Sequence, residues 1–366
     1  MKDDLIYQIA LTQVKGVGSI LSKQLEKQTG SAKAIFELNA KDRRELIGVS
    51  ESLAKAFDDK DALVRAEQEL AFIEKHHITP LFYRDDEYPQ MLKHCSDAPF
   101  LLFFKGDKQA LKLPSIAVIG TRKASVYGRD ICSDIASDIQ AQHISVNIVS
   151  GLAYGIDIAI HKSCIDNRIS TIGVLAHGLD RIYPDQHRQT AIEMLETGGL
   201  LTEFLSHTRP DKQNFILRNR IVAGMTAGTI VVESAAKGGA LITASMARNY
   251  QRKVFAYPGK VGDIQSEGCN TLIRDKHAEL ITNISQVFET LGWSIQQKKE
   301  VQQRLPFDLS EVDESILSLL SESPCHIDTI AQNLSMPIFQ LSPLLLDLEF
   351  KGMVQVFPGN YYRRRI

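Results

Sequence analysis

Polar and basic residues of the types that bind an anion follow a short apolar run. The run Ile116–Ile119 is followed by these residues: Gly120, Thr121, Arg122, Lys123 and Ser125. This order is typical of a buried strand that ends in a loop before a helix, where backbone N–H groups and the positive end of the helix dipole favour negative charge. The motif therefore predicts a phosphate site with two cations beside it.

A second loop of the same kind occupies Ser150–Asp157. Its glycines, Gly151 and Gly155, allow a ligand to come close to the backbone at another helix N-terminus. The simpler interpretation is that they only permit a tight turn between a strand and a helix. Two such loops after neighbouring strands favour one shared anion site.

A third segment combines basic side chains with an aromatic ring. Residues 209–224 contain four basic side chains and one acidic side chain: Arg209, Lys212, Arg218, Arg220 and Asp211. Arginine guanidinium groups are planar donors that suit phosphates, and Phe215, one helical turn before Asn219, offers a ring on which a base can stack. The combination indicates a groove for single-stranded nucleic acid. The simpler alternative is a solvated basic helix face.

The spacing of these motifs disfavours several enzyme classes. Thr121, Arg122 and Lys123 fill positions where a dinucleotide-binding fingerprint needs glycine, so a nicotinamide cofactor is not expected. The sequence contains neither the P-loop pattern of ATPases nor the G-x-S-x-G pattern of hydrolases. His161 and Cys164 share a helix face without further ligands, so we expect them to pack in the core. We expect no catalytic residue, no metal and no cofactor.

The elements that must position these motifs alternate over residues 115–290. Short apolar runs recur at intervals of roughly 25–30 residues, with helical patterns such as Asp185–Glu196 and Leu241–Tyr250 between them. The expected strands are Ile116–Ile119, Ser145–Val149, Thr171–Leu175, Leu200–Thr202, Thr229–Val232, Val254–Ala256 and Glu279–Ile281. The alternation predicts an α/β fold, a doubly wound parallel sheet built from βαβ units. Its ligands would lie at the carboxyl ends of the strands.

The N-terminal part, residues 1–75, is expected to be a helical domain. Gly16 and Gly18 interrupt its helical pattern, as in the helix-hairpin-helix modules whose turn points backbone amides at a DNA phosphate. An ordinary turn between two helices explains the same glycine pair equally well. Residues 76–292 then form the central domain.

The C-terminal part, residues 310–366, is expected to be winged-helix-like and follows a linker at 293–309 that includes the polar segment Ser294–Arg304. Its expected elements are helices at Val312–Leu320, Ile327–Asn333 and Ile338–Lys351 and a hairpin at Met353–Tyr362. Residues 311–362 contain seven acidic residues and one lysine. A phosphate backbone would repel such a surface. We therefore expect this part to pack against protein rather than to read DNA.

The composition is that of a cytosolic protein. Of the 366 residues, 44% are hydrophobic and 23% are charged, and the net charge is −2. No secretory segment or membrane-spanning run is apparent, and the five cysteines are scattered without a CxxC pair, which fits a reducing compartment. We therefore expect a cytoplasmic protein without a membrane partner, on which any polyanion binds a local patch.

Taken together, the motifs resemble the DNA-processing protein A family. The matching stretches cover the central domain in the order of the family: Ala117–Gly128, Val149–His161, Gly173–Pro184, Phe215–Gly224, Val231–Ala244 and Phe255–Ile273. Two departures stand out. Ile216 and Leu217 replace a proline and a basic residue that are frequent in the family, and Lys237–Ala240 replaces a more serine-rich segment.

The resemblance implies a Rossmann-like, non-enzymatic protein that binds single-stranded DNA in natural transformation, protects it and helps to load the RecA recombinase onto it. It also implies a homodimer. The residues expected to bind single-stranded DNA are Gly120, Thr121, Arg122, Ser150, Gly151, Gly155, Phe215, Arg218, Asn219, Arg220 and Lys237. Charge reversal at Arg122 or Arg218 is expected to abolish this binding and to leave the fold intact.

The alternative function is that of an enzyme on a related scaffold, a nucleoside-monophosphate phosphoribohydrolase that resembles the cytokinin-activating LOG family. The signature of that family is PGGxGTxxE. The nearest segment here, Pro258–Ser266, has Lys260 for the second glycine, Asp263 for threonine and Ser266 for the catalytic glutamate. Loss of the acid argues against hydrolysis. A third possibility is a scaffold protein whose anion loops bind no ligand.

Overall fold

The computed structural model of the chain describes residues 2–293, 310–320, 324–351 and 353–364. The chain divides into two compact units, Met1–Gln297 and Lys298–Ile366. The polar segment expected as a linker, Ser294–Arg304, lies outside the described residues. In the described parts of the chain, no helix is long and apolar enough to cross a membrane.

The first unit is built on a nine-stranded sheet with the order β1-β2-β6-β5-β4-β3-β7-β8-β9. The strands are β1 (Thr79–Phe82), β2 (Leu101–Gly106), β3 (Ser115–Ile119), β4 (Asn147–Ser150), β5 (Ser170–Val174), β6 (Gly199–Thr202), β7 (Gly228–Val231), β8 (Lys253–Ala256) and β9 (Glu279–Leu280). From β6 to β9 all neighbours are parallel, which confirms the expected doubly wound sheet. Two antiparallel strands, β1 and β2, extend it at the β6 edge.

The strand order reverses at β3, which places the loops after β3 and β7 side by side. From β3 the chain adds β4, β5 and β6 on one side, and it then crosses over to add β7 and β8 on the other. In open α/β sheets such a switch point opens a crevice at the carboxyl ends of the strands. The first predicted anion loop follows β3, so the topology places it at this crevice.

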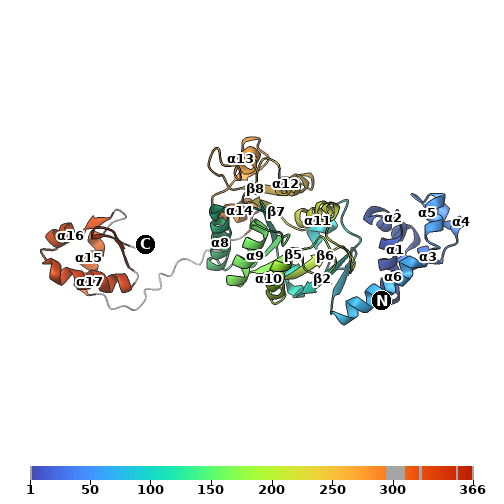
Figure 1. Cartoon of the computed structure of the whole chain (residues 1–366), viewed down its shortest axis with the longest axis horizontal. Helices are drawn as coiled ribbons and strands as arrows, with labels where there is room; N and C mark the ends of the chain where they lie inside the picture. The colour runs from blue at the N-terminus through green and yellow to red at the C-terminus, as the bar shows by residue number, and fades with distance from the viewer. Residues whose placement is uncertain (1, 294–309, 321–323, 352, 365–366) are drawn as a thin grey trace. The chain divides into compact units, whose positions relative to one another are not determined.

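Both faces of the sheet are covered by helices. Along β3, Ile116 and Val118 face one core together with residues of helices α8 (Val126–Ala141), α9 (Ile156–Asp166) and α14 (Ser285–Thr290). Ala117 and Ile119 face the other core together with residues of α11 (Lys212–Gly224) and α12 (Gly239–Asn249). Burial on both faces explains why residues 116–119 of this strand are all apolar rather than alternating, and each fully buried isoleucine contributes about 1.5–3 kcal/mol. Helices α8 and α9 lie side by side (Figure 1).

The helices of the central part connect the strands in the expected alternation. They are α7 (Gln90–Lys93), η1 (Lys108–Lys112), α8 (Val126–Ala141), α9 (Ile156–Asp166), η2 (Asp185–His187), α10 (Arg188–Glu193), α11 (Lys212–Gly224), α12 (Gly239–Asn249), α13 (Glu267–Arg274) and α14 (Ser285–Thr290). The helix expected at Asp185–Glu196 is split into a 3-10 turn and the short α10.

The N-terminal part is helical, as expected, but it shares a core with the sheet. Its helices are α1 (Lys2–Gln13), α2 (Ser19–Thr29), α3 (Ala32–Glu37), α4 (Ala40–Arg44), α5 (Glu51–Ala56) and α6 (Asp61–Lys75). Gly16, with φ +92°, turns the chain between α1 and α2. Val17 of this turn is buried in the cluster that contains Phe100 and Leu101. The turn therefore packs on the central part, and binding of DNA by it stays a prediction.

The second unit has the expected winged-helix arrangement. Its elements are α15 (Glu311–Leu319), β10 (Cys325–His326), α16 (Ile327–Asn333), α17 (Ile338–Phe350), β11 (Val354–Phe357) and β12 (Tyr361–Arg364). The three strands form one antiparallel sheet in the order β10-β12-β11. Their core is aliphatic, with Ile316, Leu341 and Leu345 fully buried. Proline at 343 lies inside α17, whose expected range is one residue longer.

Candidate nucleic-acid interface

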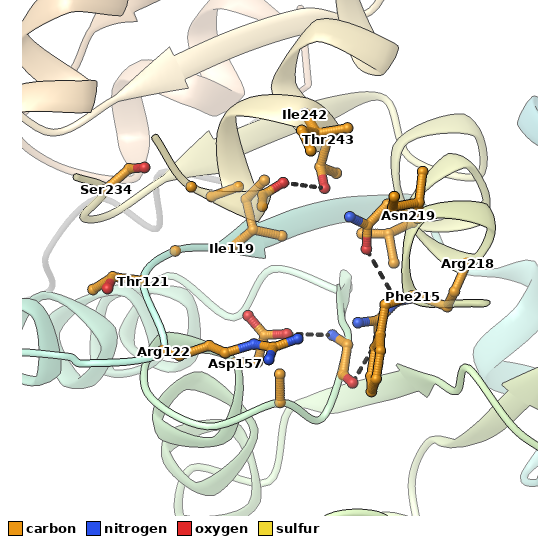
Figure 2. Close-up of a pocket in the computed structure, with 18 of the residues that line it drawn as sticks. Ile119, Thr121, Arg122, Asp157, Phe215, Arg218, Asn219, Ser234, Ile242 and Thr243 are labelled. Carbon is orange, nitrogen blue, oxygen red and sulfur yellow. Dashed lines mark hydrogen bonds between the residues drawn. The ribbon is translucent and has the colours of Figure 1, made fainter. Parts of the chain in front are cut away.

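A pocket of about 870 Å³, which we call the switch-point pocket, lies at the switch point of the sheet (Figure 2). The loops after β3, β4 and β7 and one face of α11 line it. Five of its lining residues are basic and two are acidic: Arg122, Lys123, Lys212, Arg218, Lys237, Asp157 and Asp211. The pocket therefore has the excess of positive charge that an anionic ligand requires.

The first two predicted loops are bonded to each other. The carbonyl of Thr121 accepts the Ile156 N–H at 3.1 Å, and the Thr121 N–H donates to the Glu233 carbonyl at 2.7 Å. Gly155 has φ +79°, and a Cβ there would lie 2.1 Å from the Thr121 oxygen. Only glycine allows this close approach. Gly155 thus joins the loops and does not line the pocket, although the sequence predicted it as a DNA contact.

The N-terminus of α8 is occupied by a side chain of the protein itself. The buried Glu233 carboxylate accepts the Ser125 N–H at 2.9 Å and also the Ser125 hydroxyl. A Cβ at Gly128 would lie 2.2 Å from Glu233 Oε2, so glycine makes room for the carboxylate. The N–H and hydroxyl of Ser125 are therefore not open to a ligand anion, and phosphate binding by this loop stays a prediction.

The second loop is also capped internally, by Asp157. Its carboxylate accepts the Gly151 N–H at 3.1 Å. Burial raises the pKa of Asp157, while Arg218 and backbone N–H donors act in the opposite direction. The neighbouring Ser150 is fully buried, and its hydroxyl donates to the Val118 carbonyl at 2.6 Å. Ser150 does not line the pocket, so the predicted DNA contact at this residue is not supported by its position.

Arg218 forms part of the pocket wall, but its guanidinium is already bound. Nη1 donates to the carbonyls of Gly151, at 2.6 Å, and Val174. A Cβ at Gly151 would lie 2.0 Å from Arg218 Nη1, so the guanidinium fits only against glycine. Burial lowers the pKa of Arg218, and the Asp157 charge opposes this. Arg218 therefore holds the second loop on the sheet, and it is not the open phosphate donor that the sequence predicted.

Arg220 faces a different part of the molecule. It lies about 200° around α11 from Arg218, forms an ion pair with Glu203 and donates to the Asp97 carbonyl. Arg220 is buried and does not line the pocket. The ion pair with Glu203 and the position of Arg220 outside the pocket do not support the predicted phosphate contact at this residue.

The exposed part of the site is built around Phe215 and Arg122. The Arg122 guanidinium carbon lies 5.1 Å from the centre of the Phe215 ring, and that of Arg218 lies 6.0 Å from it. Figure 2 shows Arg122 pointing from its loop toward this ring. Asn219 lines the pocket next to them and accepts a bond from Arg218 Nε at 3.2 Å. An aromatic ring beside an exposed cation can stack a base and pair its phosphate.

The N-terminus of α12 is a further part of the pocket that the sequence analysis did not identify. Its N-cap residue, Gly238, forms no side-chain cap hydrogen bond. The space around Gly239 is open, with no atom within 4 Å of a Cβ built there, and the exposed Lys237 precedes it. Among the helices that start at this pocket, α12 thus offers backbone N–H groups to an anion. The Lys-Gly-Gly sequence before an apolar helical pattern is the signal for such a site.

The structure therefore gathers eight of the eleven predicted residues in one pocket. These are Gly120, Thr121, Arg122, Gly151, Phe215, Arg218, Asn219 and Lys237. Ser150, Gly155 and Arg220 lie outside its lining. DNA contact by any of them stays a prediction.

His161 and Cys164, the two residues considered as metal ligands from the sequence, pack in the core. His161 and Cys164 are fully buried, and His161 Nδ1 bonds to Thr171 Oγ1 at 2.7 Å. Burial lowers the pKa of His161 to about 3, so the imidazole is neutral. Within residues 2–293, 310–320, 324–351 and 353–364, no group of three or more metal-ligating side chains is placed to hold an ion.

Comparison with known proteins shows which family the chain belongs to. A family described as DNA recombination-mediator protein A matches residues 79–292, and the DprA winged helix domain matches residues 300–360. The chain belongs to the DNA recombination-mediator protein A family. This confirms the resemblance to DNA-processing protein A and the fold class inferred with it. The family is described as a mediator and not as an enzyme.

Members of this family resemble the chain over most of its length. Protein Smf of Escherichia coli (strain K12) is 34% identical over 312 residues, which cover 82% of this chain and 81% of that protein. The X-ray structure of DNA processing protein A from Streptococcus pneumoniae superimposes with a TM-score of 0.67 at 31% identity, over 78% of this chain and 97% of that one. The Helicobacter pylori protein, described for its single-stranded DNA binding mode, has a TM-score of 0.53 at 28% identity, over 58% and 95%.

Proposed function

We propose that this protein binds single-stranded DNA in the switch-point pocket and acts as a recombination mediator. The observation that carries the proposal is the pairing of the exposed Arg122 with the Phe215 ring in a pocket with five basic and two acidic lining residues. A base that stacks on Phe215 would bring its phosphate to Arg122 and Lys123. Such stacking contributes about 1–3 kcal/mol per base and accepts every base.

A second phosphate position would lie at the N-terminus of α12. Lys237 and the open backbone at Gly239 line the same pocket as Arg122. Two phosphate positions in one pocket with a stacking ring suit a single strand, whose bases are accessible. A duplex keeps its bases stacked on one another, so Phe215 could not be used. The single-stranded DNA binding for which the H. pylori relative is described supports the same assignment.

Binding of labelled oligo(dT) and of a matched duplex, measured by fluorescence anisotropy over a range of salt concentrations, tests the proposal. Each phosphate neutralised on a single strand contributes a slope of about −0.7 to the plot of log K against log salt, so Arg122, Lys123 and Lys237 together predict a slope of about −2. Tighter binding of the duplex, or affinity independent of salt, would contradict the proposal.

The mediator role concerns the RecA recombinase. The family description as a recombination mediator supports the proposal that the protein protects incoming DNA during natural transformation and helps RecA to load onto it. The protein would act as a homodimer in the cytoplasm and without enzymatic activity. Formation of RecA filaments on single-stranded DNA should be faster with the protein present, and sedimentation should give twice the chain mass. No change in filament formation would contradict the mediator role.

The LOG-like alternative lacks its acid. Ser266 stands where that signature has glutamate; it is buried, and its hydroxyl donates to Asp263 at 2.8 Å. Glu203 is engaged by Arg220. Release of free base from AMP by the wild-type protein, and its loss in Glu203→Gln, would revive the alternative.

A further inference from the structure

Helix α17 of the C-terminal unit exposes a row of large apolar residues. Phe339, Leu346 and Phe350 are 74%, 51% and 83% exposed, and Pro343 is exposed between them. Their spacing of four, three and four residues is that of the a and d positions of a heptad repeat. The four side chains therefore form one stripe along the helix, which we call the α17 stripe.

The α17 stripe is separate from the face that the helix uses in its own domain. Leu341, Leu345 and Leu348 are fully buried in the core of the unit. They lie on the opposite side of the helix, since successive residues are about 100° apart. One apolar face is enough to anchor a helix on its domain. A second apolar row that remains exposed marks a protein interaction surface.

The charges beside the α17 stripe indicate what covers it. Asp347 and Glu349 lie about 80° from the centre of the stripe on either side, in the e and g positions of the heptad. Both are exposed, and Lys351 forms an ion pair with Asp347 on the same helix. Residues 311–362 contain seven acidic residues and one lysine. A DNA phosphate would be repelled here, and a second copy of α17 paired antiparallel would place Glu349 opposite Glu349.

We propose that the α17 stripe is the docking site for an amphipathic helix of another protein, one with apolar residues at a and d and lysine or arginine at e and g. Residues at e and g select the partner of such a pair, and here both flanks select positive charge. Pro343 has no N–H to donate to the Phe339 carbonyl, so this acceptor at the stripe is available for a donor of the partner. The proposal does not depend on the DNA pocket.

Two synthetic helical peptides of about three heptads test the proposal on the full-length protein. One carries leucine at a and d with lysine at e and g; the other has glutamate at e and g. The lysine peptide should bind and the glutamate peptide should not. The double variant Phe339→Ser/Phe350→Ser should weaken binding of the lysine peptide by about 10-fold or more, and Asp347→Lys/Glu349→Lys should make the protein prefer the glutamate peptide.

Ile47→Ser provides the matched control, because Ile47 is 70% exposed in the other unit. This variant should bind the lysine peptide like the wild type, and the Phe339→Ser/Phe350→Ser variant should keep its affinity for oligo(dT). Equal binding of both peptides, or unchanged binding of the lysine peptide by the double serine variant, would overturn the proposal. Self-association or duplex-DNA binding that the double serine variant abolishes would overturn it as well, in favour of a second copy or of DNA.

Discussion

Arg122 and Arg218 have the same side chain and opposite roles in one pocket. Arg122 is exposed and lies over the Phe215 ring, while Arg218 is buried and donates to backbone carbonyls. The open guanidinium can exchange water for a phosphate. The buried one would first have to give up its bonds to the carbonyls of Gly151 and Val174. At the residue scale, burial rather than residue type therefore separates the side chains that are open to a ligand from those that support the structure.

Arg218→Ala should destabilise the fold, which corrects the expectation that a change at Arg218 leaves the fold intact. The substitution removes the bonds from the buried guanidinium to the carbonyls of Gly151 and Val174, and each buried acceptor left unsatisfied costs about 1–3 kcal/mol. Urea unfolding measures the change. Arg209→Ala removes an exposed arginine nearby and should change stability by less than about 0.5 kcal/mol. Equal effects of the two variants would contradict the structural role of Arg218.

His161 should make stability depend on pH. Its pKa is lowered to about 3 in the folded protein, whereas an unfolded histidine titrates near pH 6.5. As pH falls below about 6.5, His161 binds a proton in the unfolded chain but stays neutral in the folded protein, so the free energy of unfolding decreases. Between about pH 6.5 and pH 5 this amounts to about 2 kcal/mol. His161→Gln should reduce the loss by that amount in urea titrations, and the exposed-site variant His277→Gln should not.

At the element scale, the site is made by loops that are hydrogen-bonded to one another. The loop after β3, the loop after β4 and the residues after β7 meet through the backbone of Thr121 and the carboxylates of Asp157 and Glu233. These carboxylates satisfy helix and loop N–H groups from within. Of the helices that start at the pocket in the described structure, α9 and α12 have a glycine N-cap without a side-chain hydrogen bond. The first N–H of α9 donates to the Thr121 carbonyl, whereas the space around Gly239 at the start of α12 is open.

Gly155→Ala should separate the first two loops. A Cβ there would collide with the Thr121 oxygen, and φ +79° is strained for alanine, so we expect a loss of about 1–3 kcal/mol. Gly239→Ala is the matched control for stability, because its surroundings are open and its φ is not positive. Thermal unfolding measures both. A Gly155→Ala protein as stable as Gly239→Ala would refute the account of the loops.

The parallel sheet could be predicted from the sequence, but the buried side chains that bond to the site residues could not. Apolar runs such as Ile116–Ile119 mark buried strands because burial on both faces leaves no room for polar side chains. The bond from the start of α8 to Glu233 could not be predicted, because Glu233 lies 108 positions after Ser125 in the sequence. The ion pair of Arg220 could not be predicted for the same reason, because its partner Glu203 follows a different strand, β6.

At the scale of the whole molecule, the two units have separate cores. The core around Ile316, Leu341 and Leu345 belongs to the second unit alone. The switch-point pocket is lined entirely by residues of the first. The proposed DNA binding in the pocket and the proposed helix docking at the α17 stripe therefore concern different parts of the chain.

A chain truncated after residue 297 should keep the DNA site and lose the docking site. We expect its affinity for oligo(dT) to stay within about 3-fold of the full-length value, because no pocket residue is removed. Binding of the lysine peptide should be lost. Anisotropy titrations with both probes measure this, and a large loss of oligo(dT) affinity would show that the second unit contributes to the DNA site.

The most direct measurement is the salt-dependent affinity of Arg122→Glu for oligo(dT). The account predicts binding weaker by about 30-fold or more at low salt, since one phosphate contact and the cation beside Phe215 are lost. The slope against log salt should also be shallower by about 0.7. Arg129→Glu is the control, because Arg129 is exposed on α8 but does not line the pocket. The affinity of this variant for oligo(dT) should remain near that of the wild type. Equal affinities of the wild type and Arg122→Glu would contradict single-stranded DNA binding in this pocket.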